Sequence, residues 1–151
     1  MAGAFMTQNE RTGNAIAALK AADIVAHFAK AANASNARTI AACHFKHGVE
    51  ELPLLYPVTT EIPKADSAYR DAIRDFYDAA AAAIAARLDA GKTVAVIAEG
   101  DPLFYGSYMH LHIRLAPRYP TEIVAGVTGM SGCWSATATP IAQGDDVFTV
   151  L

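Results

Sequence analysis

The sequence predicts an α/β domain built on a mainly parallel sheet flanked by helices. Short apolar runs at residues 24–28, 94–97 and 121–124 are typical of strands that are buried on both faces. Segments with apolar residues at helical spacing lie between them. Polar turns that contain glycine follow the last two of these runs. Strands that alternate with helices indicate βαβ units, which produce a parallel sheet.

Composition places the chain among globular proteins. It has 151 residues, a common size for one domain, with 53% hydrophobic and 18% charged residues. Its net charge of -3 gives no electrostatic reason to expect nucleic acid or an anionic membrane as a partner. The cysteines Cys43 and Cys133 are too few for a disulfide scaffold and suit a reducing compartment. The N-terminal residues lack a signal-peptide pattern and the alanine-rich run 79–86 is too short to span a membrane, so we expect a cytoplasmic protein.

The amino-terminal third predicts a lead-in and then alternating helices and strands. Residues 1–12 are polar and patternless, so we expect an irregular lead-in, with residues 13–151 forming the domain. Thr12 is a suitable N-cap for a helix that ends near residue 22, before the strand at 24–28. A second helix is predicted over 36–45 with Ile40 and Cys43 on its inner side, and a candidate strand follows at 49–55.

The longest predicted helix begins after a cap at Asp66 or Ser67 and runs to about Ala90. Gly91 is well placed to end it. Its inner face is given by apolar residues at helical spacing, which are Tyr69, Ile73, Phe76, Ala80, Ile84 and Leu88.

The carboxyl-terminal third predicts two more helices. One begins near Gly106 or Ser107 and ends at Leu115, and the other covers 131–138. The apolar, β-rich residues 147–151 predict a buried strand at which the chain stops, so we expect an incomplete chain.

Two turns are the candidate binding elements. Glu99-Gly100-Asp101-Pro102 follows the strand at 94–97, and a glycine-rich turn at 126–132 follows the strand at 121–124. The carboxyl ends of parallel strands are where open α/β sheets bind ligands. Glycine allows close approach of the backbone to a ligand, and Thr128 and Ser131 offer hydroxyl groups. Spacing alone favours simple chain reversal at the first turn and is equally consistent with it at the second, which does not have the form of a dinucleotide-binding fingerprint.

Other reactive side chains form weaker patterns. Cys43, His44 and His47 lie close in sequence but have no distant partners at metal-site spacing, so we expect no metal. Cys133 is better explained as a buried structural thiol than as a nucleophile, because no basic residue lies near it in sequence. No catalytic residue is assigned from these patterns.

Taken together, several segments resemble one family. GDPLFYGSYMHLHIRL at 100–115, YPTEIVAGVTGMSGCWSA at 119–136 and PIAQGDDVFTVL at 140–151 are similar to the tetrapyrrole (corrin/porphyrin) methylases. The earlier segment ALKAADIVAHFAKA at 18–31 is similar to them as well. The resemblance covers residues 14–151 and implies the N-terminal domain of a two-domain fold, with S-adenosylmethionine bound as methyl donor in the cleft between the domains.

The resemblance also implies which residues face the ligands. The implied cofactor-binding residues are Gly100, Asp101, Phe104, Thr128 and Gly129. The implied residues of the cleft wall or substrate side are Tyr105, Ser107, Tyr108 and His110. The implied role of Asp101 is to bind a polar end of the cofactor or to brace the turn.

The implied reaction is SN2 methyl transfer to C20 of a tetrapyrrole, precorrin-2 or cobalt-factor II, in cobalamin biosynthesis. The resemblance further implies a homodimer when the protein is full length. The family's first strand and its Gly-x-Gly-Pro-Gly-Asp loop have no recognisable counterpart in residues 1–12, so we expect the first strand to be missing. We also expect the second domain to be missing after Leu151, which keeps open the alternative of a non-catalytic homologue that acts as a folding or interaction module.

Overall fold

A parallel five-stranded sheet forms the centre of the molecule in the computed structural model, which describes residues 2–5, 10–30, 35–58, 61, 63 and 65–150. The strand order is β3-β2-β4-β1-β5, and every neighbouring pair is parallel. The strands are β1 (Ala2–Phe5), β2 (Ile24–Lys30), β3 (Glu50–Tyr56), β4 (Val94–Ile97) and β5 (Thr121–Ile123). The predicted α/β class with a mainly parallel sheet is therefore confirmed.

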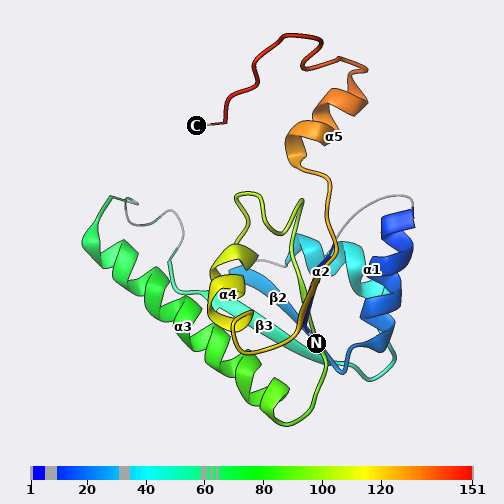
Figure 1. Cartoon of the computed structure of the whole chain (residues 1–151). Coiled ribbons are helices and arrows are strands. Elements are labelled where there is room, and N and C mark those ends of the chain that lie inside the picture. Colours follow the sequence, from blue (N-terminus) through cyan, green and yellow to red (C-terminus); the bar gives the residue numbers. More distant parts are fainter. Residues whose placement is uncertain are drawn as a thin grey trace.

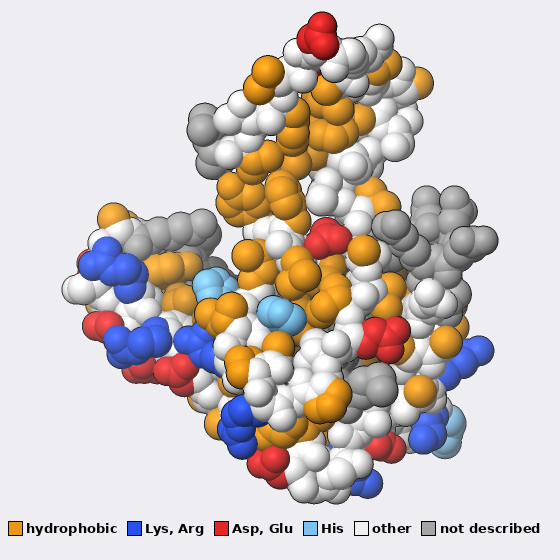
Figure 2. All heavy atoms as spheres, viewed as in Figure 1, with side chains coloured by type: hydrophobic (Ala, Val, Ile, Leu, Met, Phe, Trp, Pro, Cys, Tyr) orange, Lys and Arg blue, Asp and Glu red, His pale blue; other side chains and the backbone are white. Residues whose placement is uncertain are grey.

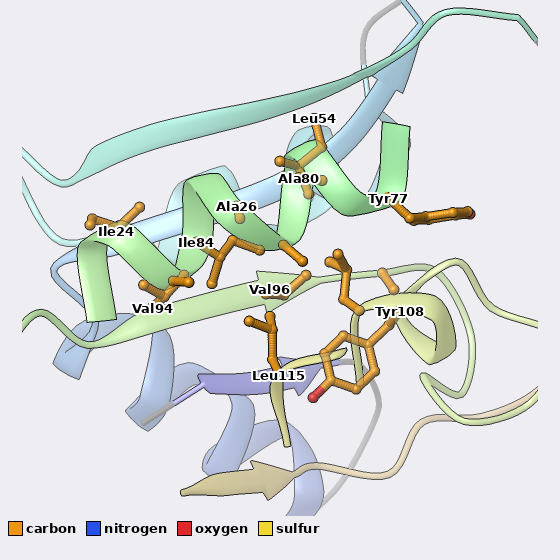
Figure 3. Packing of buried hydrophobic residues seen from close by; sticks show 14 residues of the cluster. Ile24, Ala26, Leu54, Tyr77, Ala80, Ile84, Val94, Val96, Tyr108 and Leu115 are labelled. Carbon is orange, nitrogen blue, oxygen red and sulfur yellow. The ribbon is translucent and has the colours of Figure 1, made fainter. Parts of the chain in front are cut away.

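Helices cover both faces of this sheet, and the last helix extends beyond it (Figure 1). They are α1 (Glu10–Ala21), α2 (Asn36–Ala41), the 3-10 turn η1 (Ala42–His44), α3 (Ser67–Asp89), α4 (Tyr108–Leu115) and α5 (Gly129–Ala136). Side chains of β4 pack alternately against the helices on the two faces of the sheet, because successive residues of a strand point to opposite faces. Val94 and Val96 pack with α3 and α4 (Figure 3), whereas Ala95 and Ile97 pack with α1 and α2.

The amino terminus differs from the expected irregular lead-in. Ala2–Phe5 lies between β4 and β5, with Ala2 in register with Val94 on one side and Thr121 on the other. The first strand is therefore present, and α1 already begins at Glu10. Alanine and glycine have weak strand propensity, so this strand forms through backbone pairing with two neighbours and not through a local pattern.

Helix α3 follows the prediction closely at both ends. The Asp66 side chain accepts a hydrogen bond from the Ala68 N–H at 2.8 Å and forms the N-cap. Gly91 has a φ of +76°, and the backbone there forms a Schellman motif, with N–H groups of Gly91 and Lys92 donating to Leu88 and Arg87 carbonyls. The buried face consists of Tyr77, Ala80, Ala81, Ile84 and Ala85.

Two predicted packing faces are wrong. Ile40 is 55% exposed and Cys43 is exposed, because α2 packs through Ala37 and Ala41 and then tightens into η1. Cys133 is likewise exposed and not a buried thiol.

The carboxyl-terminal segment does not form the predicted buried strand. Residues 147–150 have no regular structure and Val147 is 89% exposed. The Phe148 ring instead packs edge-on against Trp134 of α5, with ring centroids 5.8 Å apart. Figure 2 shows apolar side chains gathered on the part of the chain formed by α5 and the residues after it. Exposed apolar residues in this part include Met130, Ile141 and Val150. Across the described ranges, none of the helices has both the length and the apolarity that a membrane span requires.

Candidate functional site

The two predicted turns lie against each other at the carboxyl edge of the sheet. Gly100 has a φ of +71°, in the left-handed region that favours glycine. A Cβ atom at Gly100 would lie 3.6 Å from the Val127 carbonyl oxygen, which belongs to the second turn. Two segments from different parts of the sequence thus form one continuous surface.

Asp101 joins these turns through both of its carboxylate oxygens. Oδ1 accepts a hydrogen bond from the Leu103 N–H at 2.9 Å, within its own turn. Oδ2 accepts one from the Gly126 N–H at 3.0 Å, across to the second turn. Hydrogen bonds to an ionised acceptor are stronger than neutral ones, so this side chain fixes the spacing between the turns. Asp101 thus links the two turns.

Thr128 organises the second turn as the N-cap of α5. Its Oγ1 accepts a hydrogen bond from the Ser131 N–H at 3.2 Å, and its carbonyl accepts from Gly132 at 3.0 Å. Gly129 opens the helix, and a Cβ atom added there would meet nothing within 4 Å. The space beside the start of α5 is therefore open to a ligand.

A hollow of about 350 Å³ lies beside the loop that follows β4, on the side of β2 and β3 in the strand order. Its wall is formed by the ends of β2 and β3, the start of α2 and the loop itself, and includes Phe28, Asn36, Tyr56, Glu99 and Ser107. Small-molecule pockets commonly have volumes of about 300 to 1,000 Å³, so this hollow can hold part of a ligand. The loop over residues 99–107 therefore separates two candidate binding surfaces.

The hydroxyl groups of Tyr56 and Ser107 are hydrogen-bonded to each other in this wall. Tyr56 also lies 3.5 Å from the Tyr77 hydroxyl and packs among Phe28 and Phe76. Burial raises the pKa of Tyr56 above its ordinary value, so it remains a neutral phenol at physiological pH.

The remaining predicted residues occupy different environments. The half-buried Phe104 ring packs edge-on against the exposed Tyr105 ring, with centroids 5.0 Å apart. Tyr108 is only 2% exposed and packs in the core, where burial raises the pKa of its hydroxyl to about 12. His110 stacks on Tyr77 with ring centroids 4.3 Å apart, and its pKa is lowered by burial and by Arg114. Of the four substrate-side candidates, Tyr105 and Ser107 line the hollow.

Sequence reasoning missed Tyr56, Phe28 and Asn36 as neighbours of the site. Tyr56 and Phe28 lie at or near the ends of parallel strands, which is a signal that could have placed them at the same edge. The part of the chain that the structure describes contains no group of three or more His, Cys, Asp or Glu side chains that could hold a metal ion.

Comparison with known proteins assigns this arrangement to a family. A protein-family sequence model described as "Tetrapyrrole (Corrin/Porphyrin) Methylases" matches residues 10–151. The chain belongs to the tetrapyrrole methylase family. An X-ray structure of the cobalamin biosynthetic enzyme cobalt precorrin-4 methyltransferase, CbiF, shares the fold with a TM-score of 0.54 and 22% identity. That match covers 87% of this chain and 46% of the other.

Two relatives of this tetrapyrrole methylase domain are more similar in sequence. It is 58% identical over 140 residues to a precorrin-2 C(20)-methyltransferase of Sinorhizobium sp., covering 93% of this chain. It is 49% identical over 130 residues to the cobalamin biosynthesis protein CobIJ of Mycobacterium tuberculosis, covering 86% of this chain. The chain spans 57% of the length of the first relative and 26% of the second.

Proposed function

We propose that this chain is the amino-terminal part of an S-adenosylmethionine-dependent methyltransferase that methylates C20 of precorrin-2 or cobalt-factor II in cobalamin biosynthesis. The observation that carries the proposal is the pair of turns that Asp101 holds together at the carboxyl edge of a tetrapyrrole methylase domain. The name of the 58% identical relative supports the choice of precorrin-2 and of C20. A cytoplasmic location and a homodimer of the complete protein are part of the same proposal.

The residues around the two turns fit a bound S-adenosylmethionine. Gly129 leaves its backbone groups uncovered, since a Cβ atom there would meet nothing within 4 Å, and Gly100 has no side chain to cover its own. Backbone amides and carbonyls are suited to the ammonium, carboxylate and hydroxyl groups of this molecule. The Phe104 ring would add an apolar contact, and the Thr128 cap would hold the start of α5 in place. Asp101 holds the two turns together, and the backbone groups of the turns make the direct contacts with the ligand.

The methyl donor supplies an electrophilic methyl group when it is bound. The protein therefore needs to align the acceptor carbon with that group and to exclude water. Residues 99–107 are placed to do this, because they contribute Gly100 and Asp101 to the turns and Glu99 and Ser107 to the hollow. The acceptor would lie against the hollow, where Tyr105 and Ser107 face it.

Two arginines are poor candidates for binding the acceptor's carboxylates. Arg114 forms an ion pair with Asp78, with 2.7 Å between Nε and Oδ1, and also donates to the His110 carbonyl. Arg118 lies 4.0 Å from Asp89. We therefore assign both arginines to the surface of the domain.

Calorimetric titration with S-adenosylhomocysteine and methyl-transfer assays with precorrin-2, both on the complete gene product that carries this chain, test the proposal. The expected result is binding, methyl transfer to C20 and weaker binding in Asp101→Ala. Asp89→Ala is the matched control, because Asp89 is an exposed acidic residue that accepts a hydrogen bond from Tyr119 at 2.8 Å. A complete protein that binds no donor analogue and transfers no methyl group would support the non-catalytic alternative.

A further inference from the structure

Within the described part of the chain, the side chains of Asp101 and Tyr56 hold the loop that follows β4 at separate points. Asp101 holds its first half through the Leu103 and Gly126 N–H groups. Tyr56, 51 residues distant from Ser107 in sequence, holds its second half through the Ser107 hydroxyl. Between these points, Tyr105 has a φ of 52°, which is uncommon for a large side chain. The two halves can therefore be perturbed independently.

Ser107 occupies the N-cap position of α4 but does not cap the helix. Its backbone is in the helical region and its side chain makes no capping hydrogen bond, although serine is a favoured N-cap. The hydroxyl instead bonds to Tyr56 at the end of the edge strand β3. The role of this hydroxyl is thus tertiary, because it ties the loop to a distant strand.

Contacts other than the one with Ser107 hold the Tyr56 side chain in place. Its ring packs against Phe28 with centroids 5.8 Å apart and against Phe76 with centroids 4.7 Å apart. Its hydroxyl lies 3.5 Å from that of Tyr77, on helix α3. A ring confined in this way holds its hydroxyl at a defined position, so it can set the position of a loop.

We propose that Tyr56 is a positioning residue for methyl transfer: through Ser107 it fixes the wall of the hollow against which one edge of the tetrapyrrole acceptor binds. This inference rests on the proposed function. At about 350 Å³ the hollow is at the lower end of the range for small-molecule pockets, so it takes an edge of the acceptor and not the whole macrocycle. The two turns proposed to bind the methyl donor are joined by Asp101 and not by Tyr56. Tyr56 therefore acts on acceptor binding and not on donor binding.

The test compares Tyr56→Phe and Ser107→Ala, which each remove one hydroxyl, with Ser107→Thr, which keeps it. Tyr119→Phe is the matched control. Its hydroxyl donates to Asp89, and both residues precede the strands β5 and β4, at the end of the sheet away from the loop. We expect the acceptor KM of the complete protein to rise about threefold to tenfold in the first two variants. The Kd of S-adenosylhomocysteine stays within about twofold of its original value. Tyr119→Phe retains the original values of both, and Ser107→Thr, which keeps the hydroxyl, has an acceptor KM closer to the original value than that of Ser107→Ala.

Amide hydrogen exchange on the same variants reports the loop directly. We expect faster exchange at residues 104–107 and unchanged exchange at Leu103, whose N–H is held by Asp101. An unchanged acceptor KM, or equal losses of acceptor and donor binding, would overturn the inference. An unsubstituted protein that neither binds the donor analogue nor methylates precorrin-2 refutes the proposed function and the acceptor role with it. That outcome is distinguishable, because it is seen before any variant is compared.

Discussion

Removing the Asp101 carboxylate should destabilise the domain by separating its two turns. Asp101→Ala deletes the acceptors for the Leu103 N–H at 2.9 Å and the Gly126 N–H at 3.0 Å. Each such bond contributes about 1 kcal/mol once the partial exposure of the carboxylate is taken into account, so the expected loss is about 2 kcal/mol. Asp101→Asn keeps one acceptor oxygen but turns an NH₂ group toward an N–H donor, so about half of this loss should remain.

Urea unfolding followed by circular dichroism measures these losses. With a slope of about 2 kcal/mol per molar urea for a domain of this size, the midpoint should fall by about 1 M in Asp101→Ala. The control Asp89→Ala removes an exposed acceptor and should shift the midpoint by less than about 0.3 M. The reasoning is refuted if Asp101→Ala and Asp89→Ala unfold at the same urea concentration, or if Asp101→Asn is as unstable as Asp101→Ala.

Three further predictions concern stability. Ile84→Ala should cost about 3 kcal/mol in urea unfolding, because Ile84 is fully buried between α3 and the sheet. Gly91→Ala should lower the free energy of unfolding by about 1 kcal/mol, since alanine is strained at a φ of +76°, and calorimetry should show a lower Tm. Burial holds the pKa of His27 below its ordinary value of 6.5, so the folded state favours the neutral ring and stability should fall as the pH drops below about 6.5. His27→Gln should flatten that decline in urea titrations at pH 7.5 and 5.5, whereas an equal decline in both proteins would refute this role for His27.

The elements that the sequence predicts well are those whose signals are local. Helix α3 carries its own cap at Asp66 and its own stop at Gly91, and both are used as expected. The strand β4 is an apolar β-branched run that is buried throughout. In such segments, propensity, burial pattern and turn chemistry all favour the same structure.

The elements that it predicts poorly depend on partners elsewhere in the chain. The segment Ala2–Phe5 has no strand pattern and becomes a strand because β4 and β5 pair with it on both sides. The inner face of α2 consists of the small residues Ala37 and Ala41, whereas the larger Ile40 is exposed. Burial of a short helix therefore cannot be inferred from side-chain size alone.

The candidate site shows the same division. The sequence locates both turns, since glycine and proline after a buried strand are a local signal. It does not show that Asp101 reaches Gly126, 25 residues away, or that Ser107 reaches Tyr56. These contacts join Asp101 to the second turn and Ser107 to a distant strand. Spacing along the chain identified the loop, and only the fold identifies what holds it.

These two contacts also explain how the loop keeps a conformation that its own residues do not favour. Tyr105 in the left-handed region costs about 1 kcal/mol, and a Cβ atom at Gly106 would lie 3.2 Å from the Pro102 carbonyl oxygen. The chain therefore reverses tightly between Asp101 and Ser107, both of which are bonded to partners outside the loop. Because those partners belong to the second turn and to β3, the loop has its shape before any ligand binds. A preformed loop lowers the entropic cost of aligning two reactants, which the proposed methyl transfer would require.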